Sequence, residues 1–292
     1  MNLTLLRTLT HNNGVYWAAF SHDGKRLATA SLDNLVKLWN PATGEHTGTL
    51  KGHGDGVTFV EFLKDGRIVS ASLDRTVRIW SAEGELKTTF SGHQQYLACA
   101  AVARNGSMVA SGGFDATVRL YDPQSGEAGA VLSGHEGNVQ AVAFSSDGRL
   151  LASGGDDLSI RLWNVEAKTL KAKLSGHAAT VEALAYSPKD DQLVSGGADG
   201  FLRFWNSDGT VAASVPSRSS KVKSIGFSPD GRWLASGGTD GTIRVWNAGL
   251  RAEVAAREKA HINSVYGVAF SPDGGLLASA SFDRTIKLWK LE

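Results

Sequence analysis

The sequence predicts an all-β protein, a seven-bladed β-propeller of four-stranded blades, and three observations carry this prediction. A strand–turn–strand segment like residues 150–164 occurs seven times, each copy has an aromatic residue six positions after an Asp, and these aromatic residues recur every 41 to 43 positions. A fixed period in this range is typical of repeat arrays, whose units must stack to bury their apolar faces. The pairs are Asp33/Trp39, Asp74/Trp80, Asp115/Tyr121, Asp157/Trp163, Asp199/Trp205, Asp240/Trp246 and Asp283/Trp289.

Each repeat is predicted to hold four strands in a constant order. In the fourth repeat, residues 139–144 alternate as an inner strand, residues 150–153 form the second strand, the third strand ends at Trp163 and the fourth lies near 169–174. Between the first two strands, Asp147-Gly148 supplies the positive backbone angles that a tight hairpin needs. Most repeats keep Asp-Gly or Asn-Gly here, whereas the fifth has Pro-Lys-Asp-Asp at 188–191. Four short strands in roughly 42 residues are typical of a propeller blade.

The two ends of the chain are predicted to share one blade. Residues 3–9 alternate like an outer strand and lead to His11, as later outer strands lead to a Gly-His pair. The last repeat stops three residues after Trp289, where its outer strand would begin. We therefore expect strand 3–9 to complete the blade that contains Trp289 and to close the ring, which removes exposed inner edges. The whole chain, 1–292, is predicted to be a single domain.

The composition favours a cytoplasmic protein without a cofactor. Thirty basic and 29 acidic residues give a net charge of +1, so there is no global attraction to nucleic acid or anionic lipid. The single cysteine, Cys99, cannot form an intramolecular disulfide, and the first residues do not resemble a signal peptide. No phosphate-binding loop or cysteine pair for zinc occurs, and His22 and His46 are isolated, so neither a cofactor nor a metal is expected.

These repeats resemble the WD40 repeat family across essentially all of the chain. The family's Gly-His is present as Gly52-His53, Gly92-His93, Gly134-His135 and Gly176-His177, and the aromatic residue is mostly followed by Asn instead of the family's Asp. The resemblance implies a seven-bladed propeller that serves as a platform for assembling other proteins.

A Ser, a His and an Asp recur in each well-formed repeat and could be mistaken for a hydrolase triad. A catalytic triad occurs once, whereas this set recurs around the ring, so we expect a structural network from Trp through Ser or Thr and His to Asp, as the resemblance implies. Buried polar groups of this kind must be paired to offset their desolvation. The predicted members are His11, Thr29, Asp33, Trp39, His53, Ser70, Asp74, Trp80, His135, Ser153, Asp157, Trp163, His177, Ser195, Asp199, Trp205, His261, Ser279, Asp283 and Trp289.

Two repeats depart from this pattern. The third has Tyr121 in place of Trp, and the sixth has Arg218 where His is expected and Ser217 where Gly is expected. The sixth blade is therefore predicted to be the least firmly tied.

The resemblance also implies which residues face the rim and the mouth of the channel: the third and fifth after each His, and the one before each Asp. The predicted partner-binding residues are Tyr16, Leu32, Leu73, Tyr96, Phe114, Asp156, Glu182, Lys221, Lys223, Tyr266 and Phe282. One side of the rim would be aromatic and aliphatic, and the other would run from acidic to basic. Exposed apolar patches commonly mark interaction sites.

The favoured function is a non-enzymatic scaffold that binds a peptide or protein loop on this rim. One alternative is an enzyme with a site at the central channel, for which Asp156 with Glu182 is the nearest acid–base pair. Another is weak nucleic-acid binding through Arg218, Lys221 and Lys223, a small basic footprint that makes it the less favoured choice. The sequence leaves open the partner's identity and the oligomeric state.

Overall fold

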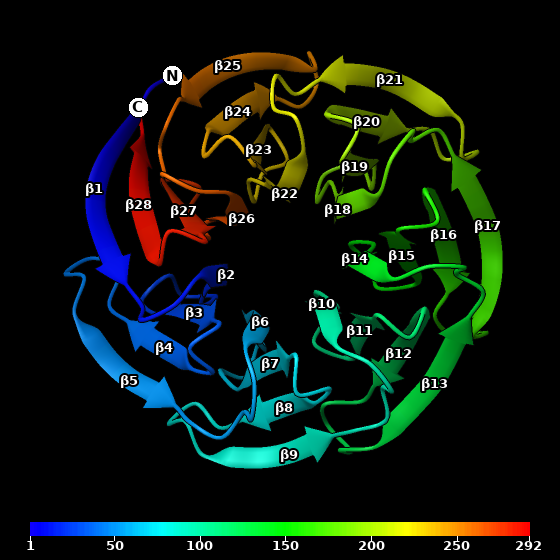
Figure 1. Ribbon diagram of the computed structural model, residues 1–292, viewed down its shortest axis with the longest axis horizontal. Coiled ribbons are helices and arrows are strands. Elements are labelled where there is room, and N and C mark those ends of the chain that lie inside the picture. Colours follow the sequence, from blue (N-terminus) through cyan, green and yellow to red (C-terminus); the bar gives the residue numbers. More distant parts are fainter.

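The computed structural model describes residues 1–292 and consists of seven four-stranded antiparallel sheets arranged as a ring (Figure 1). Each sheet is one blade, and its first strand lies nearest the central axis while its last strand lies on the circumference. The seven-bladed β-propeller predicted from the repeat period is thus confirmed.

The strands that line the axis begin four residues after the position that holds His in most of the repeats. These inner strands are β2 (Val15–Phe20), β6 (Val57–Phe62), β10 (Leu97–Val102), β14 (Val139–Phe144), β18 (Val181–Tyr186), β22 (Val222–Phe227) and β26 (Val265–Phe270). The second strands are β3 (Leu27–Ser31), β7 (Ile68–Ser72), β11 (Val109–Gly113), β15 (Leu150–Gly155), β19 (Leu193–Gly197), β23 (Trp233–Gly238) and β27 (Leu276–Ser281).

The third strands carry the repeated Trp or Tyr. They are β4 (Val36–Trp39), β8 (Val77–Trp80), β12 (Thr117–Tyr121), β16 (Ser159–Asn164), β20 (Phe201–Trp205), β24 (Ile243–Asn247) and β28 (Thr285–Leu291). The outer strands are β5 (His46–Leu50), β9 (Leu86–Phe90), β13 (Ala128–Ser133), β17 (Thr169–Ser175), β21 (Val211–Pro216), β25 (Ala252–Arg257) and β1 (Leu3–Thr10).

The N-terminal strand closes the seventh blade, as predicted. Strand β1 pairs antiparallel with β28, with Leu3 opposite Leu291 and Thr10 opposite Thr285, so the sheet order is β1-β28-β27-β26. The two ends of the chain consequently lie side by side (Figure 1). Every third strand therefore has an outer neighbour.

The hydrophobic core is divided into seven clusters, most of which lie between neighbouring blades. Between blades three and four, for example, Val118 and Leu132 of one blade pack with Phe144, Leu151 and Trp163 of the next. No blade could bury these faces alone, which is why the repeats stabilise one another.

Two kinds of turn define the two faces of the ring. In six of the seven blades the turn between the inner and second strands contains a glycine with positive φ, such as Gly148 at 73°, whereas blade five has Asp191 there at 55°. We call the side that carries these turns the lower face. The opposite side, which carries the loops with the repeated His and Asp, is the upper face.

Candidate functional site

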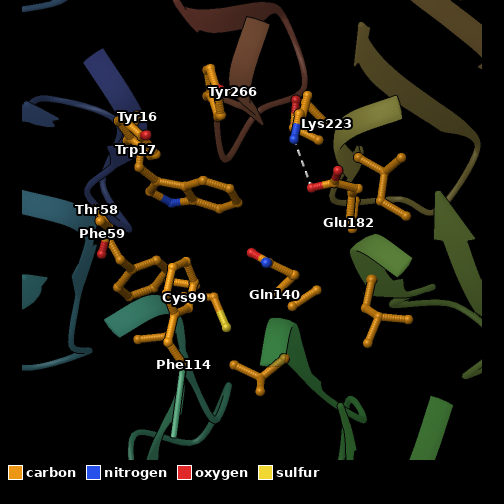
Figure 2. A pocket seen from close by; sticks show the side chains of 18 of the residues that line it. Tyr16, Trp17, Thr58, Phe59, Cys99, Phe114, Gln140, Glu182, Lys223 and Tyr266 are labelled. Atoms are coloured by element: carbon orange, nitrogen blue, oxygen red, sulfur yellow. Dashed lines mark hydrogen bonds and ion pairs between the residues drawn. The ribbon is translucent and has the colours of Figure 1, made fainter. Parts of the chain in front are cut away.

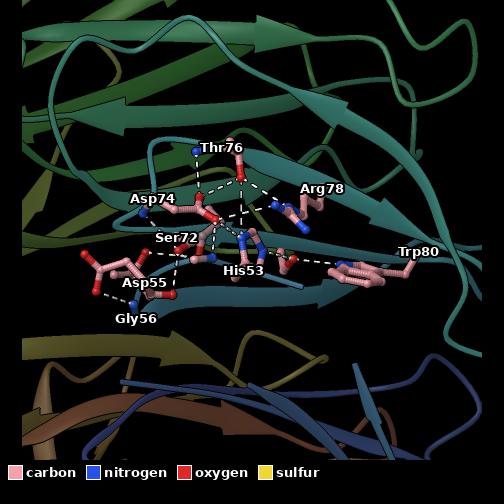
Figure 3. A network of polar contacts seen from close by, with 12 residues as sticks. His53, Asp55, Gly56, Ser72, Asp74, Thr76, Arg78 and Trp80 are labelled. Atoms are coloured by element: carbon pink, nitrogen blue, oxygen red, sulfur yellow. Dashed lines mark hydrogen bonds and ion pairs between the residues drawn. The ribbon is translucent and has the colours of Figure 1, made fainter. Parts of the chain in front are cut away.

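In six of the seven blades a hydrogen-bonded relay ties the upper loop to the blade, as Figure 3 shows for blade two. Trp80 Nε1 donates to Ser70 Oγ at 2.8 Å, and Ser70 Oγ lies 2.7 Å from His53 Nε2. His53 Nδ1 lies 2.8 Å from Asp74 Oδ2, and the Asp74 carboxylate also accepts bonds from the backbone N–H and the hydroxyl of Thr76 at 3.0 and 2.6 Å. A buried polar network with every member paired holds its loop in one position.

A neutral histidine gives every donor in this relay an acceptor. Because Ser70 Oγ accepts the indole N–H, its own hydrogen can go to Nε2, and Nδ1–H then donates to Asp74. Burial lowers the pKa of four of the equivalent histidines, in His177 to about 4, helped there by the Arg203 guanidinium. The other three are His11, His93 and His135.

The partner carboxylates are held in the charged form. Burial alone would raise the pKa of Asp74, but the hydrogen bonds from His53 and Thr76 outweigh it and hold the pKa well below its usual range. Asp157 shows the same balance, in which the hydrogen bonds from the Ser159 hydroxyl, the Glu136 backbone and His135 outweigh burial and lower the pKa.

The structure brings the predicted network together in blades one, two, four, five and seven. Its His–Asp separations lie between 2.8 and 3.1 Å. Blade three keeps the relay with Tyr121, whose hydroxyl lies 3.2 Å from Ser111 Oγ. Six near-identical copies with buried imidazoles indicate a framework role, in line with the interpretation of this set as structural.

Blade six replaces the histidine in a way that the sequence did not reveal. Arg218, which stands at the His position, points into solvent, and the next residue, Ser219, donates its hydroxyl to Asp240 at 3.0 Å instead. The buried Arg244 guanidinium adds a contact to Asp240 at 3.3 Å. Trp246 still donates to Ser236, but no imidazole joins that bond to the carboxylate.

Apolar side chains form an arc along the upper rim of blades seven, one, two and three. The ring centroids of Tyr16 and Tyr266 are 4.6 Å apart, and Phe282 lies within 6.5 Å of both. Across the arc, Tyr96 and Phe114 form a second pair at 6.4 Å. Leu32 lies in blade one with Tyr16, and Leu73 lies in blade two between the two groups; both are half-buried. We call these seven residues the aromatic rim.

Several members of the aromatic rim are open to solvent. Tyr96, Phe114 and Phe282 are 49%, 38% and 39% exposed. Ile262, which sequence reasoning missed, is almost fully exposed in the upper loop of blade seven. Its position directly follows His261, so its exposure could have been inferred from the polar or small residues found there in other repeats.

The opposite side of the rim is polar, but its charges are largely paired. Lys223 Nζ lies 2.8 Å from Glu182 Oε2, and Arg218 lies 3.7 Å from Glu253. Lys221 is exposed. The basic footprint considered for nucleic acid is therefore reduced to one cation without an acidic partner.

The acidic residues considered for catalysis are engaged separately. Glu182 pairs with Lys223, while Asp156 accepts a weak bond from Gln140 Nε2 at 3.3 Å. Each carboxyl group therefore has a hydrogen-bond partner of its own on the upper side of the channel.

A cavity of about 240 Å³ occupies the channel between these two sides (Figure 2). Tyr16, Gln140, Glu182, Lys223 and Tyr266 surround it, each at the second position of its inner strand. The predicted rim residues Leu73 and Phe114 also line it.

Trp17 and Phe59 are further lining residues that the sequence did not assign to the channel. Trp17 packs on Phe59 with ring centroids 5.5 Å apart. The pairing of β2 with β3 shifts register between Val15 and Trp17. Such a bulge interrupts strict alternation, so both Tyr16 and Trp17 reach the channel.

No group of three or more His, Cys, Asp or Glu side chains is placed to hold a metal ion. Burial raises the pKa of the Cys99 thiol to about 12, which keeps it in the unreactive form. The structure contains no helix long and apolar enough to cross a bilayer.

Comparison with protein families gives two matches. A model of the first β-propeller of IFT122 matches residues 100–292, and a model of the WD domain, G-beta repeat, matches residues 3–40 and 44–81. Together these matches cover most of the chain.

Curated relatives match part of the chain. Protein tipD of Dictyostelium discoideum is 33% identical over 40% of this chain and 19% of its own length. The U3 small nucleolar RNA-associated protein 15 homolog of Xenopus tropicalis is 34% identical over 37% of this chain and 21% of its own. WD repeat and SOCS box-containing protein 1 of the same species is 34% identical over 35% and 25%. The aligned segments thus span about a fifth to a quarter of these relatives.

Proposed function

Because the chain belongs to the WD40 repeat family of seven-bladed β-propellers, we propose that it acts as a non-enzymatic scaffold that binds a peptide or protein loop on the upper face. WD40 propellers typically serve as scaffolds to which other proteins bind. The observation that carries the proposal for this chain is the aromatic rim beside an open channel cavity.

The chemistry of the upper face favours a ligand with large apolar side chains. Exposed aromatic rings offer contact area at low entropic cost, and such residues dominate the binding energy of protein interfaces. The Glu182–Lys223 pair and Gln140 lie across the cavity and can orient the polar backbone of a bound segment. The cytoplasm, where Cys99 stays reduced, remains the predicted location.

We expect the triple variant Tyr16→Ala/Phe114→Ala/Phe282→Ala to lose binding of peptides selected on the native protein. A displayed library of random peptides would be enriched on the native propeller, and the dissociation constants of the enriched peptides measured by calorimetry. Loss of three aromatic contacts should weaken binding on the order of 100-fold or more.

The matched control removes equally exposed apolar side chains from the outer strands. Leu86, Val131 and Leu170 are 47%, 46% and 45% exposed, and the variant Leu86→Ala/Val131→Ala/Leu170→Ala should bind as the native protein does. Both variants must melt near the native temperature. Peptides that bind the rim variant at native affinity would show that the recognition surface lies elsewhere.

A further inference from the structure

Six of the seven inner strands carry Ala or Gly at the penultimate position, and one carries a carboxylate. The small residues are Ala19, Ala101, Ala143, Ala185, Gly226 and Ala269, and the exception is Glu61 in β6. Ala101, Ala143 and Ala185 pack in cores between neighbouring blades. Blade two therefore places an ionisable group where the other blades place a methyl group or a hydrogen.

Glu61 has no cationic partner. Its Oε1 accepts one bond, from the backbone N–H of Phe62 at 3.1 Å, and no Lys, Arg or His nitrogen forms a salt bridge with it. Burial raises the pKa of this carboxyl group to about 7. Glu61 is half-buried, and taking an unpaired carboxylate out of water is costly; groups perturbed in this way cluster at functional sites.

A cavity of about 270 Å³ opens beside Glu61 on the lower face, between blades two and three. Its lining is mixed: Phe62, Leu63, Val102 and Ala103 contribute to it, but all of these except Val102 are almost fully buried, and polar groups form the rest. A cavity of about 150 Å³ already admits a benzene molecule, so there is room for the end of a side chain or a small ligand.

Three basic residues also line this cavity, namely His22, Lys64 and Arg104. All three are exposed on the turns of the lower face, so solvent and salt screen their charges. The Glu61 carboxylate is half-buried, so solvent and salt screen its charge less than theirs.

We propose that this cavity binds an organic cation, an alkylammonium or guanidinium group that enters from the lower face and pairs with the Glu61 carboxylate. The half-buried Val102 side chain can contact the hydrocarbon stem of such a group. A divalent metal ion does not fit, because Ca²⁺ and Mg²⁺ require about six oxygen ligands and this cavity has a single carboxylate. The cation could belong to a free amine or to a Lys or Arg side chain of a docked protein.

The test follows the Glu61 carboxyl carbon by NMR across a pH titration, with and without n-butylammonium or n-butylguanidinium. We expect both cations to lower the apparent pKa of Glu61. Their affinity should be roughly tenfold higher at about pH 8 than at about pH 6, because they bind the deprotonated form. The isosteric variant Glu61→Gln should lose both the binding and its pH dependence. A capped Gly-Arg-Gly peptide that binds more tightly than n-butylguanidinium would identify a protein segment as the source.

Two control variants isolate the contribution of the Glu61 carboxylate. The variant Lys64→Gln/Arg104→Gln should bind n-butylammonium at least as well as the native protein, because it removes repelling charges. The variant Tyr16→Ala/Phe114→Ala/Phe282→Ala should bind n-butylammonium as the native protein does. The peptide-binding proposal for the upper face and the cation-binding proposal for the lower face can therefore fail independently. The inference is overturned if Glu61→Gln binds the cations as well as the native protein does. It is equally overturned if the cations leave the apparent pKa of Glu61 unchanged. Binding of butyrate in place of the cations, with that binding lost in Lys64→Gln/Arg104→Gln, would overturn it too.

Discussion

Asp74→Ala is expected to lower the free energy of unfolding by about 2 kcal/mol, because it leaves a buried histidine without its acceptor. The Asp74 carboxylate accepts bonds from His53, from the backbone of Gly54, and from the backbone and hydroxyl of Thr76. Without it, the remaining oxygen near His53 Nδ1 is the Thr76 hydroxyl, at a long 3.4 Å. The measurement is urea unfolding at neutral pH, followed by tryptophan fluorescence.

Asp240→Ala in blade six is the matched comparison. Asp240 occupies the same position but has no histidine partner, and its side chain is 33% exposed where that of Asp74 is 12% exposed. Its removal should cost about 1 kcal/mol or less, since water can replace part of what it accepts. Equal losses for the two variants would show that the imidazole link adds nothing to the stability of a blade.

Acidification is expected to destabilise the protein in two stages. Burial holds the pKa of His11, His93, His135 and His177 below 6.5, so below that pH the unfolded chain binds more protons than the folded one and stability falls. The shift of His177 to about 4 alone corresponds to a loss on the order of 3 kcal/mol by pH 4. Below about pH 4, protonation of the network aspartates removes further stability, because their folded pKa values are depressed.

Protonation of Glu61 stabilises the folded state, which opposes the destabilisation by the histidines. The effect of the histidines on stability is therefore best measured in a variant without the Glu61 carboxyl group. The raised pKa of this group makes the folded state the better proton binder between about pH 4.5 and 7, so its contribution to stability is lost as the pH rises through that window. Urea unfolding of Glu61→Gln at several pH values should therefore show a steeper loss toward acid than the native protein. A stability that stays constant from neutral pH to about pH 5 in this variant would contradict neutral, buried histidines.

Features within one repeat could be predicted from the sequence. The order of strands, the turn glycines and the members of the relay all recur at fixed spacing, and the structure places them as that spacing indicates. Blade six shows the limit of this reasoning. Arg218 stands at the histidine position, yet its neighbour Ser219 reaches Asp240, because a long charged side chain gains more from water than from the small buried site.

The sequence by itself determined the number of blades, the closure of the ring by residues 3–9 and the relay within each blade, because all of these follow from a repeated local pattern. Only the tertiary structure decided which residues meet between blades. It paired Lys223 with Glu182 across blades five and six, turned Trp17 into the channel at a bulge, and left Glu61 without a partner. The bulge itself recurs at the same place in all seven inner strands, but the side chains that it turns toward the channel, and the partners that they meet there, differ from blade to blade and do not follow from the period of the repeat.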